Sequence, residues 1–107
     1  MSSGEPIVIL CTVPSVEAGE TLARSLVEAR LAACVNILPG LTSVYRWNGE
    51  IQVDREAQLI IKTRASLLER ASEHIAANHP YETPEVIALP ITGGSERYLA
   101  WLASEVS

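Results

Sequence analysis

The 107-residue sequence is poor in aromatic side chains and contains no phenylalanine. Aromatic residues make up 5% of the chain and hydrophobic residues 48%, so the core must be built mainly from aliphatic side chains. With only two cysteines, the chain is not a disulfide-rich scaffold. Its apolar content also excludes a disordered chain. A chain of this length is expected to fold as one domain around one core, without the help of disulfides or metals.

Positive charge is scarce as well. Eight Lys and Arg residues stand against thirteen Asp and Glu residues, which leaves a net charge of −5. Without a basic stripe we expect no nucleic-acid partner. The longest apolar run, Ile7–Val13, is too short to cross a bilayer. The first residues lack the positive charge and apolar stretch of a secretory signal, so we expect a cytoplasmic protein whose Cys11 and Cys34 stay reduced.

The mean hydropathy is nevertheless positive, at +0.18. A small domain unavoidably exposes much of its surface. Surplus apolar residues on such a domain indicate a surface that is buried against another subunit.

The first third of the sequence predicts a strand followed by a helix. The segment Pro6–Val13 is short, β-branched and almost continuously apolar, which is typical of a strand buried on both faces. Ser15 fits the N-cap of a helix. Apolar residues at four-residue spacing then give this helix one apolar face up to Arg30.

A long β-rich stretch from Ala32 to Thr63 has Asn48-Gly49 near its middle, which is a strong signal for a two-residue hairpin turn. Each arm would have about 14 residues and reach roughly 46 Å at about 3.3 Å per residue. A domain of this length is only about 34 Å across. The hairpin must therefore bend or protrude, with Pro39-Gly40 as the place for a bend or bulge. A protruding ribbon that carries aromatic and aliphatic residues needs a partner.

The remaining sequence predicts a helix, a strand and a terminal helix. Ser66 to Glu69 fits a capping box, and the helix that it begins should end near Asn78, because His79 precedes a proline. Val86–Pro90 is a short strand, and a small helix follows Gly93-Gly94-Ser95. The order β-α-β-β-α-β predicts an α+β, ferredoxin-like fold: an antiparallel sheet with two helices on one face, plus a short C-terminal helix.

This topology also bears on the two cysteines. With the third strand between the first and second, Cys11 and Cys34 would lie about 9 to 10 Å apart. That separation exceeds the reach of a disulfide, so we expect two free thiols. Each is most simply a small core hydrophobe.

The one polar cluster of the sequence is the segment 78–85 (NHPYETPE). It brings an imidazole, a phenol and carboxylates together on a backbone that two prolines fix, which suits a transition-metal or small-ligand site. The same prolines would equally suit a structural connection at a subunit boundary. No catalysis is expected, because neither His74 nor His79 has a nucleophile partner with a third, orienting group that the sequence reveals.

Five segments in order resemble the CutA divalent-cation tolerance proteins. They are Ala32-Ala33-Cys34-Val35-Asn36-Ile37, Ser43-Val44-Tyr45-Arg46-Trp47-Asn48-Gly49, Ile61-Lys62-Thr63, His79-Pro80-Tyr81-Glu82-Thr83-Pro84-Glu85 and Tyr98-Leu99-Ala100-Trp101-Leu102. The resemblance covers residues 6 to about 104, so we expect a flexible tail over residues 1–5 and a single CutA-like domain over residues 6–107.

The resemblance implies a homotrimer, similar in architecture to the nitrogen-regulatory PII trimers, that is joined through the long Asn48-Gly49 hairpin and the sheet edges. It also implies the binding of copper, as Cu(II), or of another divalent transition metal such as Zn(II). The implied ligands are Cys11, His79 and Glu85, whereas Asn78 replaces a second histidine that some members carry before His79.

A different function is implied by the likeness to PII trimers: a signalling module whose inter-subunit clefts bind a small molecule or a partner protein. Trp47, Lys62, Tyr81 and Glu82 would be the cleft residues. Because this function rests on an analogy of fold, the metal-binding function is the first hypothesis and the signalling function is the alternative.

Overall fold

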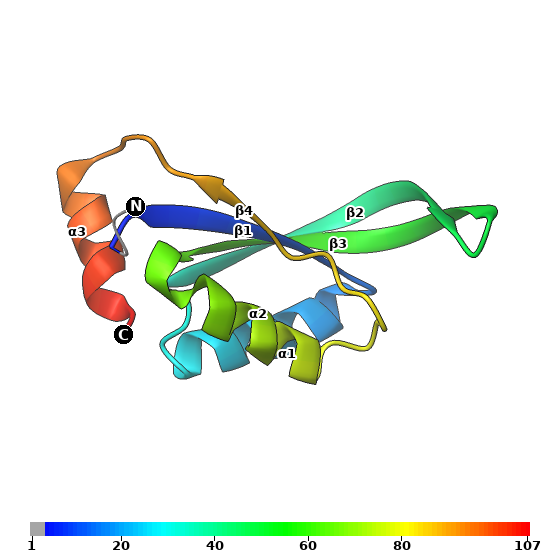
Figure 1. The fold of residues 1–107 in the computed structure, drawn as a ribbon, viewed down its shortest axis with the longest axis horizontal. Helices are drawn as coiled ribbons and strands as arrows, with labels where there is room; N and C mark the ends of the chain where they lie inside the picture. The colour runs from blue at the N-terminus through cyan, green and yellow to red at the C-terminus, as the bar shows by residue number, and fades with distance from the viewer. Residues whose placement is uncertain (1–3) are drawn as a thin grey trace.

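A four-stranded antiparallel sheet lies at the centre of the computed structural model, which describes residues 4–107 (Figure 1). The strands are β1 (Pro6–Val13), β2 (Cys34–Trp47), β3 (Glu50–Arg64) and β4 (Ile87–Pro90), in the order β2-β3-β1-β4. Helices α1 (Val16–Glu28) and α2 (Leu68–Asn78) cover one face, and α3 (Glu96–Glu105) lies at the end of the sheet away from the hairpin tip. The predicted α+β, ferredoxin-like fold is confirmed.

Along β1, buried side chains alternate with half-buried ones, and the buried set forms part of the core between the sheet and the two helices. Ile7, Ile9, Cys11 and Val13 are buried on the helix side, and the residues between them are only half-buried on the other side. The prediction that this strand is buried on both faces is therefore wrong for the single chain. The physical reason is that the two long helices cover only one face, and the face of the sheet away from them, called the open face below, has no layer of its own.

The first helix begins as predicted, since the Ser15 hydroxyl accepts a hydrogen bond from the Ala18 N–H (3.1 Å). Its close approach to the sheet depends on Gly19. A Cβ atom at this position would lie 3.0 Å from Val13 Cγ2 and 3.1 Å from Leu59 Cδ2. Only glycine lets α1 pack at this distance without displacing the core.

The hairpin of β2 and β3 protrudes beyond the helices, as its length predicted, and the molecule measures 44 × 25 × 23 Å (Figure 1). Asn48 and Gly49 both have positive φ, of 51° and 78°, as the two-residue turn requires. The predicted irregularity at Pro39-Gly40 is confirmed as a bulge, because the pairing register shifts between Leu38 and Leu41.

The surplus apolar surface lies largely on this hairpin and on the edge strand. Val44, Ile51 and Val53, called the apolar stripe below, share one hairpin face and are 67%, 60% and 63% exposed. Ile87 and Leu89 on β4 are 51% and 49% exposed. The location of the surplus on the hairpin and on a sheet edge therefore agrees with the sequence analysis.

One helix start was predicted wrongly. Instead of a capping box at Ser66, a 3-10 turn over Ala65–Leu67 leads into α2, and no side chain caps either start. Leu67 is buried, and the Ala65 N–H donates to the carbonyl of Glu5 (2.8 Å). These tertiary contacts hold Ser66 within the turn, whereas an N-cap residue needs extended backbone.

Two further expectations concern the termini and the cysteines. Residues 1–3 of the tail expected over residues 1–5 lie outside the described residues. Cys11 and Cys34 are both free thiols, as predicted. No helix within residues 4–107 has the length and apolar character to span a membrane.

Candidate functional site

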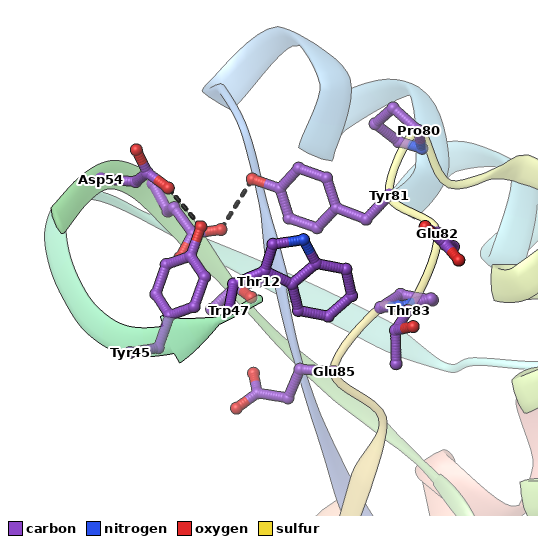
Figure 2. Close-up of a pocket in the computed structure, with 11 residues that line it drawn as sticks. Thr12, Tyr45, Trp47, Asp54, Pro80, Tyr81, Glu82, Thr83 and Glu85 are labelled. Carbon is purple, nitrogen blue, oxygen red and sulfur yellow. Dashed lines mark hydrogen bonds between the residues drawn. The ribbon is translucent and has the colours of Figure 1, made fainter. Parts of the chain in front are cut away.

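A cavity of about 580 Å³ lies where the hairpin faces the loop between α2 and β4 (Figure 2). We call it the cleft. The end of β1, the two hairpin arms and the loop residues 80–85 each contribute to it. Its lining residues are Thr12, Tyr45, Trp47, Asp54, Glu56, Pro80, Tyr81, Glu82, Thr83, Pro84 and Glu85.

The bulge in β2 decides which hairpin side chains reach the cleft. Before the bulge, the even-numbered residues of β2 share the face of Gln58 and Lys62, the open face. The register shift inserts one residue, so that from Leu41 onward the odd-numbered residues lie on that face. Tyr45 and Trp47 therefore lie on the same face as Asp54 and Glu56.

Two tyrosine–carboxylate hydrogen bonds order the cleft. The Tyr81 hydroxyl donates to Glu56 Oε2 (2.7 Å), which ties the loop to the hairpin, and the Tyr45 hydroxyl donates to the Asp54 carboxylate. The pKa of Tyr81 is raised, first by burial and then by its hydrogen bond to Glu56. The pKa of Tyr45 is raised chiefly by its hydrogen bond to Asp54. Both phenols therefore stay protonated near neutral pH and act as donors to the carboxylates.

His79 holds the start of the loop against β1. Its Nε2 lies 2.8 Å from the carbonyl of Thr12, and its Nδ1 accepts a hydrogen bond from the Tyr81 N–H (3.1 Å). Because a carbonyl can only accept, Nε2 carries the proton and Nδ1 offers its lone pair to the backbone. The His79 ring also packs on the Tyr81 ring, with 4.7 Å between centroids. His79 therefore positions Tyr81, and both of its ring nitrogens are already engaged.

Cys11 does not reach the cleft. Its side chain is 0% exposed and belongs to the core cluster under the helices, whereas its neighbour Thr12 lines the cleft. Burial, followed by the negative charges of Glu85 and Glu56, raises the pKa of the Cys11 thiol to about 12. At neutral pH the thiol is protonated, and a metal would have to displace that proton to bind.

Glu85, the third predicted metal ligand, does line the cleft, and its Oε1 accepts a hydrogen bond from Gln58 Nε2 (3.3 Å). Across the described residues 4–107, no three His, Cys, Asp or Glu side chains form a group that could hold a metal ion. As arranged in one chain, Cys11, His79 and Glu85 do not fit a metal, and the ligand set stays a prediction.

Three of the four predicted cleft residues come together: Trp47, Tyr81 and Glu82 all line the cavity. Lys62 does not. It pairs with Val8 and Cys34 in the sheet, and its Nζ lies 5.9 Å from the ring centroid of Tyr98 on α3.

Sequence analysis missed four residues of the hairpin and of β1 that line the cleft, namely Thr12, Tyr45, Asp54 and Glu56. The usable signal was Pro39-Gly40. A single-residue bulge there changes the phase of the alternation and so aligns the later part of β2 with the carboxylates of β3.

Comparisons with known proteins agree on one family. The family model described as "CutA1 divalent ion tolerance protein" matches residues 7–105. The chain is 64% identical over 96 residues to the chloroplastic protein CutA of Arabidopsis thaliana, covering 90% of this chain and 53% of that protein. It is 54% identical over 95 residues to the divalent-cation tolerance protein CutA of Thermus thermophilus, covering 89% and 92%.

A crystal structure of CutA1 from Oryza sativa superposes with a TM-score of 0.94 at 55% identity, covering 96% of this chain and 94% of that one. The chain spans about half the length of the curated plant relatives, 53% of the Arabidopsis protein and 54% of the chloroplastic rice protein. The match therefore extends over nearly the whole of this chain but not over the whole of those relatives.

Proposed function

The chain belongs to the CutA1 divalent ion tolerance family, and from that premise we propose that it is a non-catalytic homotrimer whose cleft binds a small molecule. The observation that carries the proposal is the cleft itself. It combines about 580 Å³ of space with three aromatic rings and several carboxylates, and the hydrogen bond from Tyr81 to Glu56 links its loop side to its hairpin side. Ligand sites are typically cavities of this size with a few fixed polar groups.

The apolar stripe and the edge strands support the oligomer. Val44, Ile51 and Val53 are more than half exposed on a hairpin that projects from the body of the chain. Strands β2 and β4 are the two edges of the sheet, with backbone groups available for pairing. Contact between copies would cover both features, and the number of three copies comes from the family resemblance. A monomeric mass in sedimentation equilibrium would contradict this part of the proposal.

The cleft hypothesis is tested by a thermal-shift screen of nucleotides and metabolites in metal-free buffer. We expect at least one compound to raise the melting temperature of the native chain and to lose this effect with Trp47→Ala. The trimer mass of the variant serves as the control for correct assembly. A screen in which no compound stabilises the native chain would overturn the small-molecule function.

Binding of a divalent transition metal, Cu(II) or another such as Zn(II), is the second candidate. The names of the relatives, which carry the words divalent-cation tolerance, support it. Cu(II) titration of the native chain, Cys11→Ser and His79→Ala tests it. Lower stoichiometry in both variants is expected if these residues are ligands, and unchanged stoichiometry in both would reject the assignment. Asn78, in the place of a possible histidine ligand, instead donates from Nδ2 to the His74 carbonyl (2.8 Å).

The absence of catalysis stays part of the proposal, and one contact supports it. His74 Nε2 and Ser25 Oγ lie 2.8 Å apart, which resembles a nucleophile and its base. However, the Ser25 hydroxyl donates its proton to the Leu22 carbonyl (2.8 Å), so His74 must be the donor to Ser25. An imidazole in that state cannot take the serine proton.

We also propose the cytoplasm as the location of this chain. Relatives carry the words chloroplastic, in Arabidopsis thaliana, and periplasmic, in Archaeoglobus fulgidus. Fractionation of cells that express the native sequence tests this location, and recovery outside the cytoplasm would contradict it.

A further inference from the structure

The charges around the cleft are all of one sign. Asp54, Glu56, Glu82 and Glu85 are four of its lining residues, and the described lining includes no Lys, Arg or His. An anionic ligand would face these carboxylates without a counter-charge. Since the Tyr45 and Tyr81 hydroxyls already donate to carboxylates, they do not offer their protons to an anion either.

Aromatic rings form the other part of the wall. Figure 2 shows the side chains of Tyr45, Trp47 and Tyr81 gathered between the hairpin and the loop. The faces of such rings attract cations, and tryptophan does so most strongly. In a chain with so few aromatic residues, three rings in one cavity are a concentrated feature.

The carboxylates are spread around the cavity and do not converge on one point. This follows because no three acidic, histidine or cysteine side chains within residues 4–107 form a group that could hold a metal ion. A bare divalent ion needs several oxygen ligands at short distance. A cavity of about 580 Å³ leaves room for a ligand much larger than an ion.

We propose that the cleft binds a small organic cation, with an alkylammonium or guanidinium group enclosed by Tyr45, Trp47 and Tyr81 and neutralised by the carboxylates around them. This inference rests on the proposed role of the cleft as a small-molecule site and names the chemical class of its ligand. Trp47 supplies the cation–π surface, and Glu82 supplies charge from the loop side.

The test uses the full-length assembled protein and calorimetric titration with tetramethylammonium, n-butylammonium and n-butylguanidinium chlorides at constant ionic strength. tert-Butanol and butyrate serve as the neutral and anionic probes. We expect saturable binding of at least one cation and none of the neutral or anionic probes. Trp47→Leu and Glu82→Gln should each weaken that binding about tenfold, as expected for the loss of one cation–π or one charge contact.

Glu73→Gln is the matched control, because it makes the same change of charge at an exposed position of α2 that does not line the cleft. Its affinity for the cation should equal that of the native chain. An equal loss in Glu73→Gln and Glu82→Gln would show that only the overall charge acts, and it would overturn the site. A native oligomeric mass in all variants excludes misfolding as the cause.

Three other results would also overturn the proposal. Equal binding of tert-butanol would show that the cavity is merely apolar. Stabilisation by a neutral or anionic metabolite, with no binding of the cations, would reject this ligand class and leave the small-molecule function intact. No binding of any probe or metabolite would reject both.

Discussion

Replacing Val44 and Val53 by threonine tests whether the apolar stripe is a subunit interface. The two valines are cross-strand partners in the hairpin, and they are 67% and 63% exposed in the single chain. Threonine keeps the β-branched shape that favours a strand and replaces one methyl group by a hydroxyl. The folded monomer should therefore tolerate both changes, whereas an interface that desolvates these positions should not.

The magnitude follows from the area that remains to be buried. Full burial of a valine side chain contributes about 1.5–3 kcal/mol. Since roughly two-thirds of each side chain is still exposed, covering it would contribute about 1–2 kcal/mol per valine. Threonine keeps one of the two methyl groups and so gives up only part of this contribution, but its hydroxyl must also be desolvated, which costs about 1–3 kcal/mol when it finds no hydrogen-bond partner. The two changes together therefore cost about 2–4 kcal/mol per subunit, which corresponds to at least about 30-fold weaker association per subunit.

The assay is sedimentation equilibrium or light scattering over a dilution series of the double variant. Val27→Thr is the matched control, because Val27 is 43% exposed on α1, outside the hairpin. We expect the double variant to dissociate at concentrations where the native chain and Val27→Thr stay assembled. An unchanged dissociation profile of the double variant would refute the assignment of the apolar stripe to an interface.

Three further predictions concern the cleft and the core. Tyr81→Phe should lower the free energy of unfolding by about 1 kcal/mol, because it removes the hydrogen bond to Glu56; equal denaturant midpoints would contradict this. The Cys11 thiol, whose pKa is raised to about 12, should resist a thiol reagent at pH 8 in the native chain, while the half-buried Cys34 should react. Mass spectrometry of the labelled peptides measures both reaction rates, and equal rates for the two cysteines would refute this prediction. Gly19→Ala should leave the free energy of unfolding unchanged or lower it by up to about 2 kcal/mol, because the close contact of the added methyl group with Val13 and Leu59 cancels or outweighs the gain in helix propensity. A rise in the free energy of unfolding would show that these core side chains move aside at no cost.

Local turn chemistry explains most of what the sequence predicted correctly. Asn48-Gly49 requires positive φ at both residues, and that requirement alone places the hairpin turn. Ser15 forms its expected cap because its backbone is extended, which lets its hydroxyl accept from the Ala18 N–H. Ser66 is not an N-cap, because the burial of Leu67 and the hydrogen bond from the Ala65 N–H to the Glu5 carbonyl fix the chain around it. Those are contacts between distant segments, which a local pattern does not contain.

The cleft was predictable only in its loop half. Tyr81 and Glu82 belong to one short polar segment, so the sequence already shows them together. Asp54 and Glu56 come close to them only through the pairing of the hairpin arms and the return of the chain after α2. Cys11 was assigned to the metal site through the family resemblance, but the alternation of β1 turns its thiol into the core.

The bulge at Gly40 links the two proposed roles of the hairpin. After the shift in register, one hairpin face carries Tyr45 and Trp47 toward the cleft, and the opposite face carries Val44 and its partner Val53. Without the inserted residue, β2 would present the valine where the tyrosine now meets its carboxylate, because one step along a strand reverses every side chain. The proposed ligand site and the proposed subunit contact therefore depend on the same single-residue insertion, because it decides which side chains each face of the hairpin carries.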